Sequence, residues 1–121
     1  EQEKLKERIA GMYKDAGIEI PKNDEIYALD SDKRVINAIF DRLYKEGVLV
    51  KVDPSYNISK EGWNRVAAAA RTAGAEGSFV LADFRDTLNT SRKYASVYLA
   101  ALDRAGITVF DGERRRLPEG K

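Results

Sequence analysis

Hydrophobic positions between residues 90 and 106 fall on one face of a helix. They recur at intervals of three and four residues, the spacing of a buried helical stripe. Thr90 or Ser91 can cap the free amides of the first turn, and Gly106 is the residue type that ends a helix by adopting a positive φ. The predicted buried face consists of Tyr94, Ala95, Tyr98, Leu99 and Leu102.

Extended and turn patterns flank this helix on both sides. An alanine-rich helix is predicted over residues 60–73, followed by a short strand and a short helix within residues 78–88. Residues 107–117 place Asp111 and Gly112 between two β-prone runs, a strong signal for a two-residue hairpin turn. The order helix, strand, helix, helix, hairpin predicts a winged helix.

The first half of the chain shows the same order of elements. Two longer helices are predicted over residues 3–16 and 32–46. Asn23 can cap a brief helix between them, and Asp30 or Ser31 can cap the helix that follows. A hairpin pattern comes next, so this half predicts a second winged helix.

An offset of 59 residues aligns the two halves. It places Gly47 on Gly106, and hydrophobic positions around these glycines also coincide. The predicted fold class is therefore mainly α with small β-hairpins, arranged as tandem winged-helix modules. The expected modules are residues 1–59 and residues 60–121, a size at which a hydrophobic core is thin.

Composition excludes several classes of function. The 121 residues contain neither Cys nor His, which excludes disulfides, zinc sites of the usual kind and imidazole acid-base catalysis. No phosphate-cradling glycine loop or paired carboxylates are found, so we expect no enzyme activity. No apolar run reaches the length of a membrane span, and we expect a cytoplasmic protein. A first residue that is Glu instead of Met indicates a fragment of something longer.

The start of the helix in the second module is the first candidate site. Ser91, Arg92 and Lys93 lie beside unpaired amides that attract phosphate, although an Arg-Lys pair taken by itself is more often simply a solvated first turn. The helix dipole disfavours cations here, and the following turns expose only short side chains. This favours contact with an RNA loop or bulge over a DNA major groove. Asp30 and Asp32 at the matching position would repel phosphate, so a scaffold role is predicted for the first module.

The hairpin of the second module is the second candidate. Side chains alternate along a strand, so Arg114 and Arg116 share one face and Arg115 points to the other. These cations either contact a nucleic-acid backbone or protect an edge strand against aggregation. Arg85, which precedes the helix, could point to the same surface.

Residues 84–95 and 102–117, FRDTLNTSRKYA and LDRAGITVFDGERRRL, resemble the C-terminal end of the SelB family of bacterial selenocysteine-specific elongation factors. The family typically shows FRD, a capped turn similar to Leu-Gly-Thr-Ser-Arg-Lys, then DR-x-G and a basic hairpin. Asn89 stands where glycine is common, but asparagine also tolerates a positive φ.

The resemblance implies four winged helices behind an EF-Tu-like GTPase, of which this chain would be the last two. The final module would hold the selenocysteine insertion hairpin (SECIS) of an mRNA and tether the factor for UGA recoding. No cofactor is expected in this part, and GTP, selenocysteinyl-tRNA and the ribosome would engage the parent protein. A monomer without membrane contact is expected. The implied RNA-binding residues are Arg85, Thr90, Ser91, Arg92, Lys93, Arg114 and Arg116.

Two alternatives to this function stay open. Winged helices most commonly bind DNA in transcriptional regulators, and some serve only as protein-interaction modules. Net charge is +1, so the overall charge does not favour a nucleic-acid partner.

Overall fold

The protein forms two compact units, Glu1–Trp63 and Asn64–Lys121, in a computed structural model that describes residues 2–119. The division falls inside a helix that begins at Lys60, whereas the sequence pattern places the module boundary between residues 59 and 60. Within the described range, we find no helix with the length and apolar character that crossing a membrane requires.

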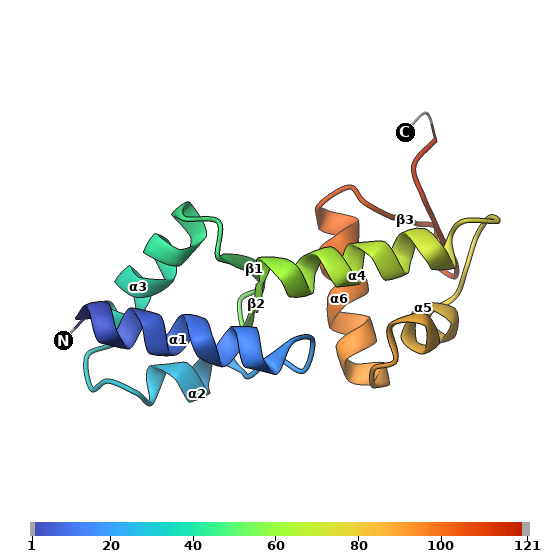
Figure 1. The fold of residues 1–121 in the computed structure, drawn as a ribbon. Coiled ribbons are helices and arrows are strands. Elements are labelled where there is room, and N and C mark those ends of the chain that lie inside the picture. The colour runs from blue at the N-terminus through green and yellow to red at the C-terminus, as the bar shows by residue number, and fades with distance from the viewer. Residues whose placement is uncertain (1, 120–121) are drawn as a thin grey trace. The chain divides into compact units, whose positions relative to one another are not determined.

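Unit 1 contains three helices and a hairpin in chain order (Figure 1). Its elements are α1 (Gln2–Ala16), α2 (Asn23–Tyr27), α3 (Lys33–Lys45), β1 (Leu49–Asp53) and β2 (Tyr56–Ser59). The two strands pair antiparallel. A bridge to the residue before α2 adds a third extended segment to the hairpin.

Unit 2 has the same order of elements. They are α4 (Lys60–Ala73, whose first turn belongs to unit 1), α5 (Leu81–Leu88), α6 (Arg92–Arg104), β3 (Val109–Phe110) and β4 (Arg115–Arg116). The strands β3 and β4 pair antiparallel, and Phe79 bridges to Arg115 across β4. The predicted fold class, mainly α with small hairpins, is confirmed.

Each unit buries its own hydrophobic core. In unit 1, Tyr13 of α1 and Phe40 of α3 meet edge to face with ring centroids 6.5 Å apart. In unit 2, four of the five residues predicted for the buried face of α6 are fully buried, while Tyr94 is partly exposed. The largest buried side chains of unit 2 are Tyr98, Phe79, Phe84 and Leu99.

The helices α3 and α6 correspond to each other residue by residue. Both have 13 residues, and their bounds differ by the predicted offset of 59 at each end. Their N-caps, Asp32 and Ser91, differ by the same offset. Both helices end before a glycine in the left-handed region, Gly47 at φ 75° and Gly106 at φ 78°. The internal repeat seen in the sequence is therefore a repeat of local structure.

The prediction that Asn23 caps α2 is wrong. Asn23 is the first helical residue and is buried, so its side chain serves the interior. Its amide nitrogen donates to the Pro54 carbonyl at 3.3 Å, and its oxygen accepts from Tyr13 at 3.5 Å and from Asn57 at 3.4 Å. These bonds tie α1 and α2 to the hairpin.

The prediction that Asp30 or Ser31 caps α3 is also wrong. Asp32 is the cap, and its carboxylate accepts from the amide of Arg34 at 3.0 Å. Asp30 instead accepts from the amide of Asp32 at 2.7 Å. The carboxylate of Asp30 thus fixes the turn that positions the cap.

Two glycines of unit 1 give a matched test of its packing. A Cβ at Gly62 would lie 2.8 Å from Ile58 Cγ1 and 3.0 Å from the Gly17 carbonyl, whereas a Cβ at Gly11 meets nothing within 4 Å. We expect Gly62→Ala to lower the free energy of unfolding by about 1–3 kcal/mol, because overpacking forces a shift of neighbouring atoms. Gly11→Ala should raise the free energy of unfolding by about 1 kcal/mol, because alanine favours a helix interior. Urea unfolding followed by NMR signals of unit 1 measures both; equal effects would contradict the packing described here.

Candidate nucleic-acid interface

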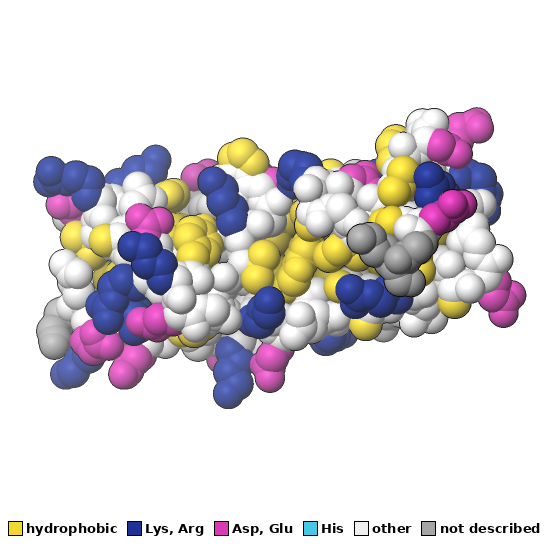
Figure 2. All heavy atoms as spheres, turned by 90° about the horizontal axis from the view of Figure 1, so that it is seen from above, with side chains coloured by type: hydrophobic (Ala, Val, Ile, Leu, Met, Phe, Trp, Pro, Cys, Tyr) yellow, Lys and Arg dark blue, Asp and Glu magenta, His cyan; other side chains and the backbone are white. Residues whose placement is uncertain are grey.

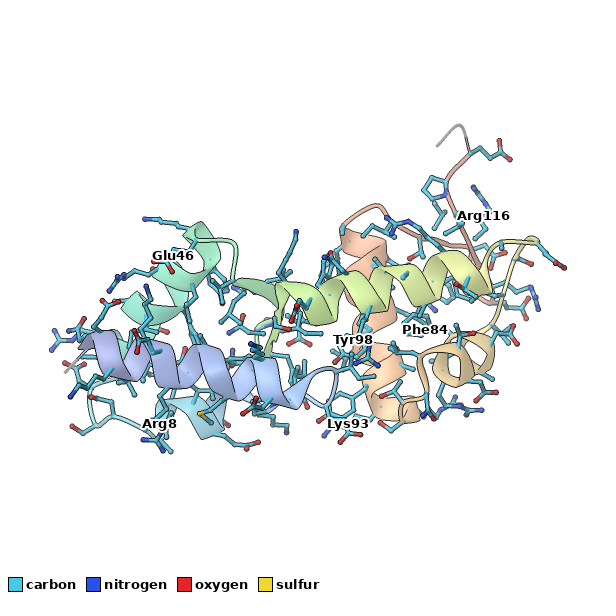
Figure 3. The ribbon with its side chains drawn as sticks, in the orientation of Figure 1. Arg8, Glu46, Phe84, Lys93, Tyr98 and Arg116 are labelled. Atoms are coloured by element: carbon cyan, nitrogen blue, oxygen red, sulfur yellow. The ribbon has the colours of Figure 1, made fainter. Side chains whose placement is uncertain are left out.

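Two cations stand exposed at the start of α6. The hydroxyl of Ser91 accepts from the amide of Tyr94 at 3.2 Å, which caps the helix and leaves Arg92 and Lys93 in its first turn. Both are exposed, and no carboxylate of residues 2–119 forms an ion pair with either. Figure 3 shows Lys93 at this end of the helix. The helix start therefore offers two cations to an anionic ligand.

A tight corner between α5 and α6 sets the direction of this helix start. Asn89 ends α5 in the left-handed region at φ 60°, as its tolerance of positive φ predicts. The amide of Thr90 then donates to the carbonyl of Arg85 at 3.1 Å. The Arg85 side chain is one third exposed, and its Nε donates to Asp86 at 3.1 Å. Arg85 thus lies beside the helix start with its charge partly compensated.

The hydroxyl of Thr90 points into the protein. Its Oγ1 is buried and has no hydrogen-bond partner among the residues that the structure describes. The cap of α6 is therefore Ser91, and a direct contact between the Thr90 hydroxyl and a ligand would require the corner to open.

The start of α3 carries equivalent cations that are already paired. Arg34 donates from Nε and Nη2 to Asp32 at 3.1 and 3.2 Å. Hydrogen bonds from the Arg34 side chain and backbone hold the pKa of Asp32 below its usual value. Lys33 lies over the ring of Tyr27, with Nζ 4.6 Å from the centroid. Lys93 of unit 2 likewise lies near an aromatic ring, with Nζ 5.7 Å from the centroid of Tyr94. The two helix starts therefore differ in the ion pair of Arg34 with Asp32, which unit 1 has and unit 2 lacks among the described residues.

The turn of the second hairpin lies one residue later than predicted. The amide of Asp111 donates to the carbonyl of Arg114 at 3.0 Å, so Gly112 and Glu113 are its central residues. The carboxylate of Asp111 accepts from the amides of Glu113 and Arg114, both at 2.8 Å. Asp111 therefore starts the turn through its side chain, as aspartate often does, instead of occupying its centre.

Arg115 is a structural residue of the hairpin. Its guanidinium binds the carboxylate of Asp103 at 2.9–3.2 Å, and its side chain is only 14% exposed. The guanidinium carbon also lies 4.0 Å from the centroid of the Phe110 ring. Asp103 was not singled out in the sequence, although a carboxylate in the last turn of a helix opposes the helix dipole and signals a specific partner.

The other two arginines of the hairpin are exposed. Arg114 donates from Nε to the hydroxyl of Ser78 at 2.7 Å and from Nη2 to its carbonyl at 3.1 Å. Arg116 donates only a long hydrogen bond, 3.5 Å, to the carbonyl of Leu117. Arg116 is accordingly the freer cation of the two.

The candidate residues fall into two groups within unit 2. Arg85, Ser91, Arg92 and Lys93 gather at the start of α6, whereas Arg115 anchors the hairpin to Asp103 near its end. A rise of 1.5 Å per residue separates positions 92 and 103 by about 16 Å along the helix axis. In Figure 3, Lys93 lies beside the start of α6, and Arg116 lies well apart from it, toward the far end of α4.

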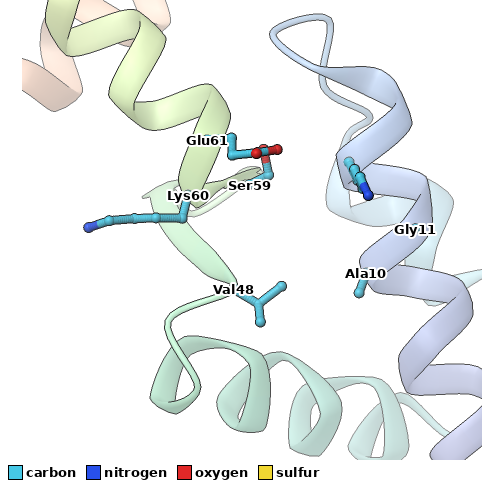
Figure 4. A pocket seen from close by; sticks show the side chains of 7 residues that line it. Ala10, Gly11, Val48, Ser59, Lys60 and Glu61 are labelled. Atoms are coloured by element: carbon cyan, nitrogen blue, oxygen red, sulfur yellow. The ribbon is translucent and has the colours of Figure 1, made fainter.

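The pocket described next contains none of the candidate RNA-binding residues. A pocket of about 340 Å³ in unit 1 is lined by Ala10, Gly11, Lys14, Val48, Ser59, Lys60 and Glu61 (Figure 4). No cluster of three Asp, Glu, His or Cys side chains that could hold a metal ion occurs in residues 2–119. The face shown in Figure 2 intersperses basic with acidic side chains, so a nucleic-acid contact on this face would depend on local groups of cations.

Comparison with known proteins finds one matching sequence profile and two similar structures. Residues 71–117 match the sequence profile described as elongation factor SelB, winged helix, which confirms the resemblance noted for residues 84–95 and 102–117. The mRNA-binding domain of elongation factor SelB from E. coli, solved in complex with SECIS RNA, is 22% identical with a TM-score of 0.81, over 98% of this chain and 97% of that chain. A bacterial selenocysteine-specific elongation factor, EF-Sec, is 21% identical with a TM-score of 0.75; the match covers 98% of this chain but 19% of that protein. A search of curated protein sequences gave no match.

The turn of the second hairpin should respond to acid. Hydrogen bonds from the amides of Arg114 and Glu113 lower the pKa of Asp111. A depressed folded-state pKa stabilises the turn above the ordinary aspartate pKa of about 3.9, and this stabilisation is lost as the pH falls through the folded-state value. An NMR titration of the Asp111 carboxyl should therefore give a midpoint below the ordinary value. Asp111→Asn keeps an acceptor and should remove this acid response of the turn; a midpoint at or above the ordinary value would contradict the hydrogen-bonding pattern.

Proposed function

We propose that this chain is the mRNA-binding part of a selenocysteine-specific elongation factor and holds the selenocysteine insertion hairpin at the start of α6. The observation that carries the proposal is the contrast between the two equivalent helix starts. Arg92 and Lys93 have no acidic partner among the described residues, while Asp32 binds Arg34 at the same position of unit 1. The residues that match the SelB profile lie in unit 2, which contains Arg92 and Lys93.

The shape of α6 favours an RNA bulge or loop over a DNA groove. Beyond Arg92 and Lys93, the outer side of the next turns presents only the short side chains of Ser96, Val97 and Ala100. A helix that reads a DNA major groove normally reaches the bases with longer polar side chains over two turns. Here only the first turn reaches far, which suits phosphates and a few unstacked bases.

Arg114 and Arg116 extend the proposed contact along the RNA. A separation of about 16 Å along α6 is within the length of an A-form RNA stem of several base pairs. A hairpin stem docked at the start of α6 is long enough to bring its backbone near the wing. We infer a phosphate-contacting role for these arginines and a scaffold role for unit 1.

We assign GTP, selenocysteinyl-tRNA and the ribosome to a longer parent protein. The EF-Sec match places this chain against 19% of that factor, which leaves room for a GTPase elsewhere. The chain would then act as the tether that brings the factor to a UGA codon in the cytoplasm.

Binding of two fluorescent probes tests the proposal. One is an RNA hairpin with a bulged base, and the other is duplex DNA of the same length, each titrated at two salt concentrations. We expect the RNA hairpin to bind far more tightly than the DNA duplex at both. Equal affinities would overturn the RNA proposal and favour a DNA-binding regulator, and the lack of any binding would favour a protein-interaction module.

Arg92→Ala should weaken binding of the bulged hairpin by about 1–3 kcal/mol, the range for a guanidinium that meets a base edge. Removal of a cation from a helix N-terminus does not harm the helix, so thermal unfolding should be unchanged or slightly raised. Anisotropy titration gives the affinity. Charge removal at Lys33 and Arg34, the equivalents of Arg92 and Lys93 in α3, is the matched control and should change affinity little. A loss as large as that of Arg92→Ala would refute the different roles of the two units.

Lys93→Ala should act through phosphate alone. We expect the slope of log K against log salt to fall by about one unit, because one counterion fewer is released. The preference between bulged and fully paired hairpins should stay nearly constant. A changed preference with an unchanged slope would show that Lys93 contacts a base.

A further inference from the structure

The second hairpin exposes an aromatic ring that the fold does not need to expose. Phe110 is 46% exposed and its neighbour Val109 is 36% exposed, and they are the large exposed hydrophobic residues of the described chain. Successive side chains of a strand point to opposite faces, so the two do not form one apolar patch. The ring therefore requires an explanation separate from packing.

Several bonds hold this ring in place. Phe110 pairs with Arg115 across the hairpin, and the Arg115 guanidinium lies 4.0 Å from the ring centroid. Asp103 fixes that guanidinium, and the Arg115 backbone exchanges hydrogen bonds of 2.8 and 2.9 Å with Phe79. One part of the ring is thus covered by a rigid planar cation while much of the rest stays open to solvent. A pre-organised aromatic surface of this kind loses little entropy on binding.

Two exposed cations lie next to the ring in the chain but on the other face of the hairpin. Arg116 is exposed with little internal pairing, and Arg114 is exposed beside Ser78. Of the two carboxylates in the turn, Asp111 is bound to backbone amides, and Glu113 is exposed. On the face of the ring itself, the guanidinium of Arg115 lies over Phe110. This pair matches an unpaired base, because bases stack on aromatic and guanidinium planes. Bases inside a duplex are already stacked, so the matching ligand is single-stranded.

We propose that Phe110 is a stacking platform for an unpaired base of single-stranded RNA next to the stem of the RNA hairpin. This inference rests on the proposed function, because the stem is docked at the start of α6. The platform lies near the other end of that helix, about 16 Å away along its axis. It therefore engages a segment of RNA separate from the bulge at Arg92.

Two RNA probes test the platform. The first is the bulged hairpin with a blunt stem, and the second carries six unpaired nucleotides on the 5′ or the 3′ side of the stem. We expect one of the extensions to tighten binding by the wild type about five- to a hundredfold, the range for one stacked base. Phe110→Leu, which stays apolar but has no π face, should abolish this gain, and Phe110→Tyr should keep it. Val109→Ala is the matched control and should also keep the gain.

The outcomes separate this inference from the proposed function. If the protein does not bind the RNA hairpin at all, the proposed function is refuted. Binding of octauridylate alone would then test the platform by NMR. An upfield shift of the Phe110 ring protons would support the platform, and unshifted protons would overturn it. If the hairpin binds but neither extension adds affinity, or if Phe110→Leu keeps the gain, the inference is wrong. Concentration-dependent dimers of the wild type that Phe110→Leu abolishes would also overturn it, because a second copy would then cover the ring.

Discussion

The ion pair between Asp103 and Arg115 determines where the wing of unit 2 lies. Strands of two residues are too short to be stable alone, so the hairpin needs an anchor outside its own ladder. The pair supplies one by joining β4 to the last turn of α6, in addition to the backbone hydrogen bonds between Arg115 and Phe79. In unit 1, a hydrogen bond of 2.5 Å from Tyr44 of α3 to Asn57 of β2 makes the corresponding link. A charged anchor in one unit and a neutral one in the other thus produce the same fold, but only the charged anchor also orients an exposed ring.

The two units share the geometry of their equivalent helices but differ in the charges at the helix starts. Equivalent bounds, caps and left-handed glycines of α3 and α6 show that the backbone is conserved between the two copies. At the helix start, however, unit 1 pairs Arg34 with Asp32, whereas Arg92 and Lys93 of unit 2 have no acidic partner among the described residues. Burial of hydrophobic side chains stabilises both units. The difference in charge at the helix start can therefore affect binding without altering the fold.

Local patterns predicted most of the fold, and long-range partners account for most of the errors. Helix periodicity and the glycines at positions 47 and 106 act within a few residues, and the structure places those elements as predicted. Asn23 was read as a cap because nothing nearby reveals that Tyr13 and Asn57 need a polar partner in the core. The roles of the hairpin arginines likewise depend on distant residues, since alternation separates Arg115 from its neighbours but does not identify Asp103. The RNA-binding residues themselves remain predictions.

The cap position of the repeated helix separates folding from ligand choice. Ser, Asn and Asp start a helix with similar free energies, because the cap needs only one acceptor oxygen. Aspartate also brings a full negative charge to the point where a ligand would approach, and serine does not. Exchange of serine for aspartate at this one position therefore adds a charge that repels phosphate while the helix start keeps its cap. A winged helix of this kind can change its choice of ligand at the cap without losing the helix.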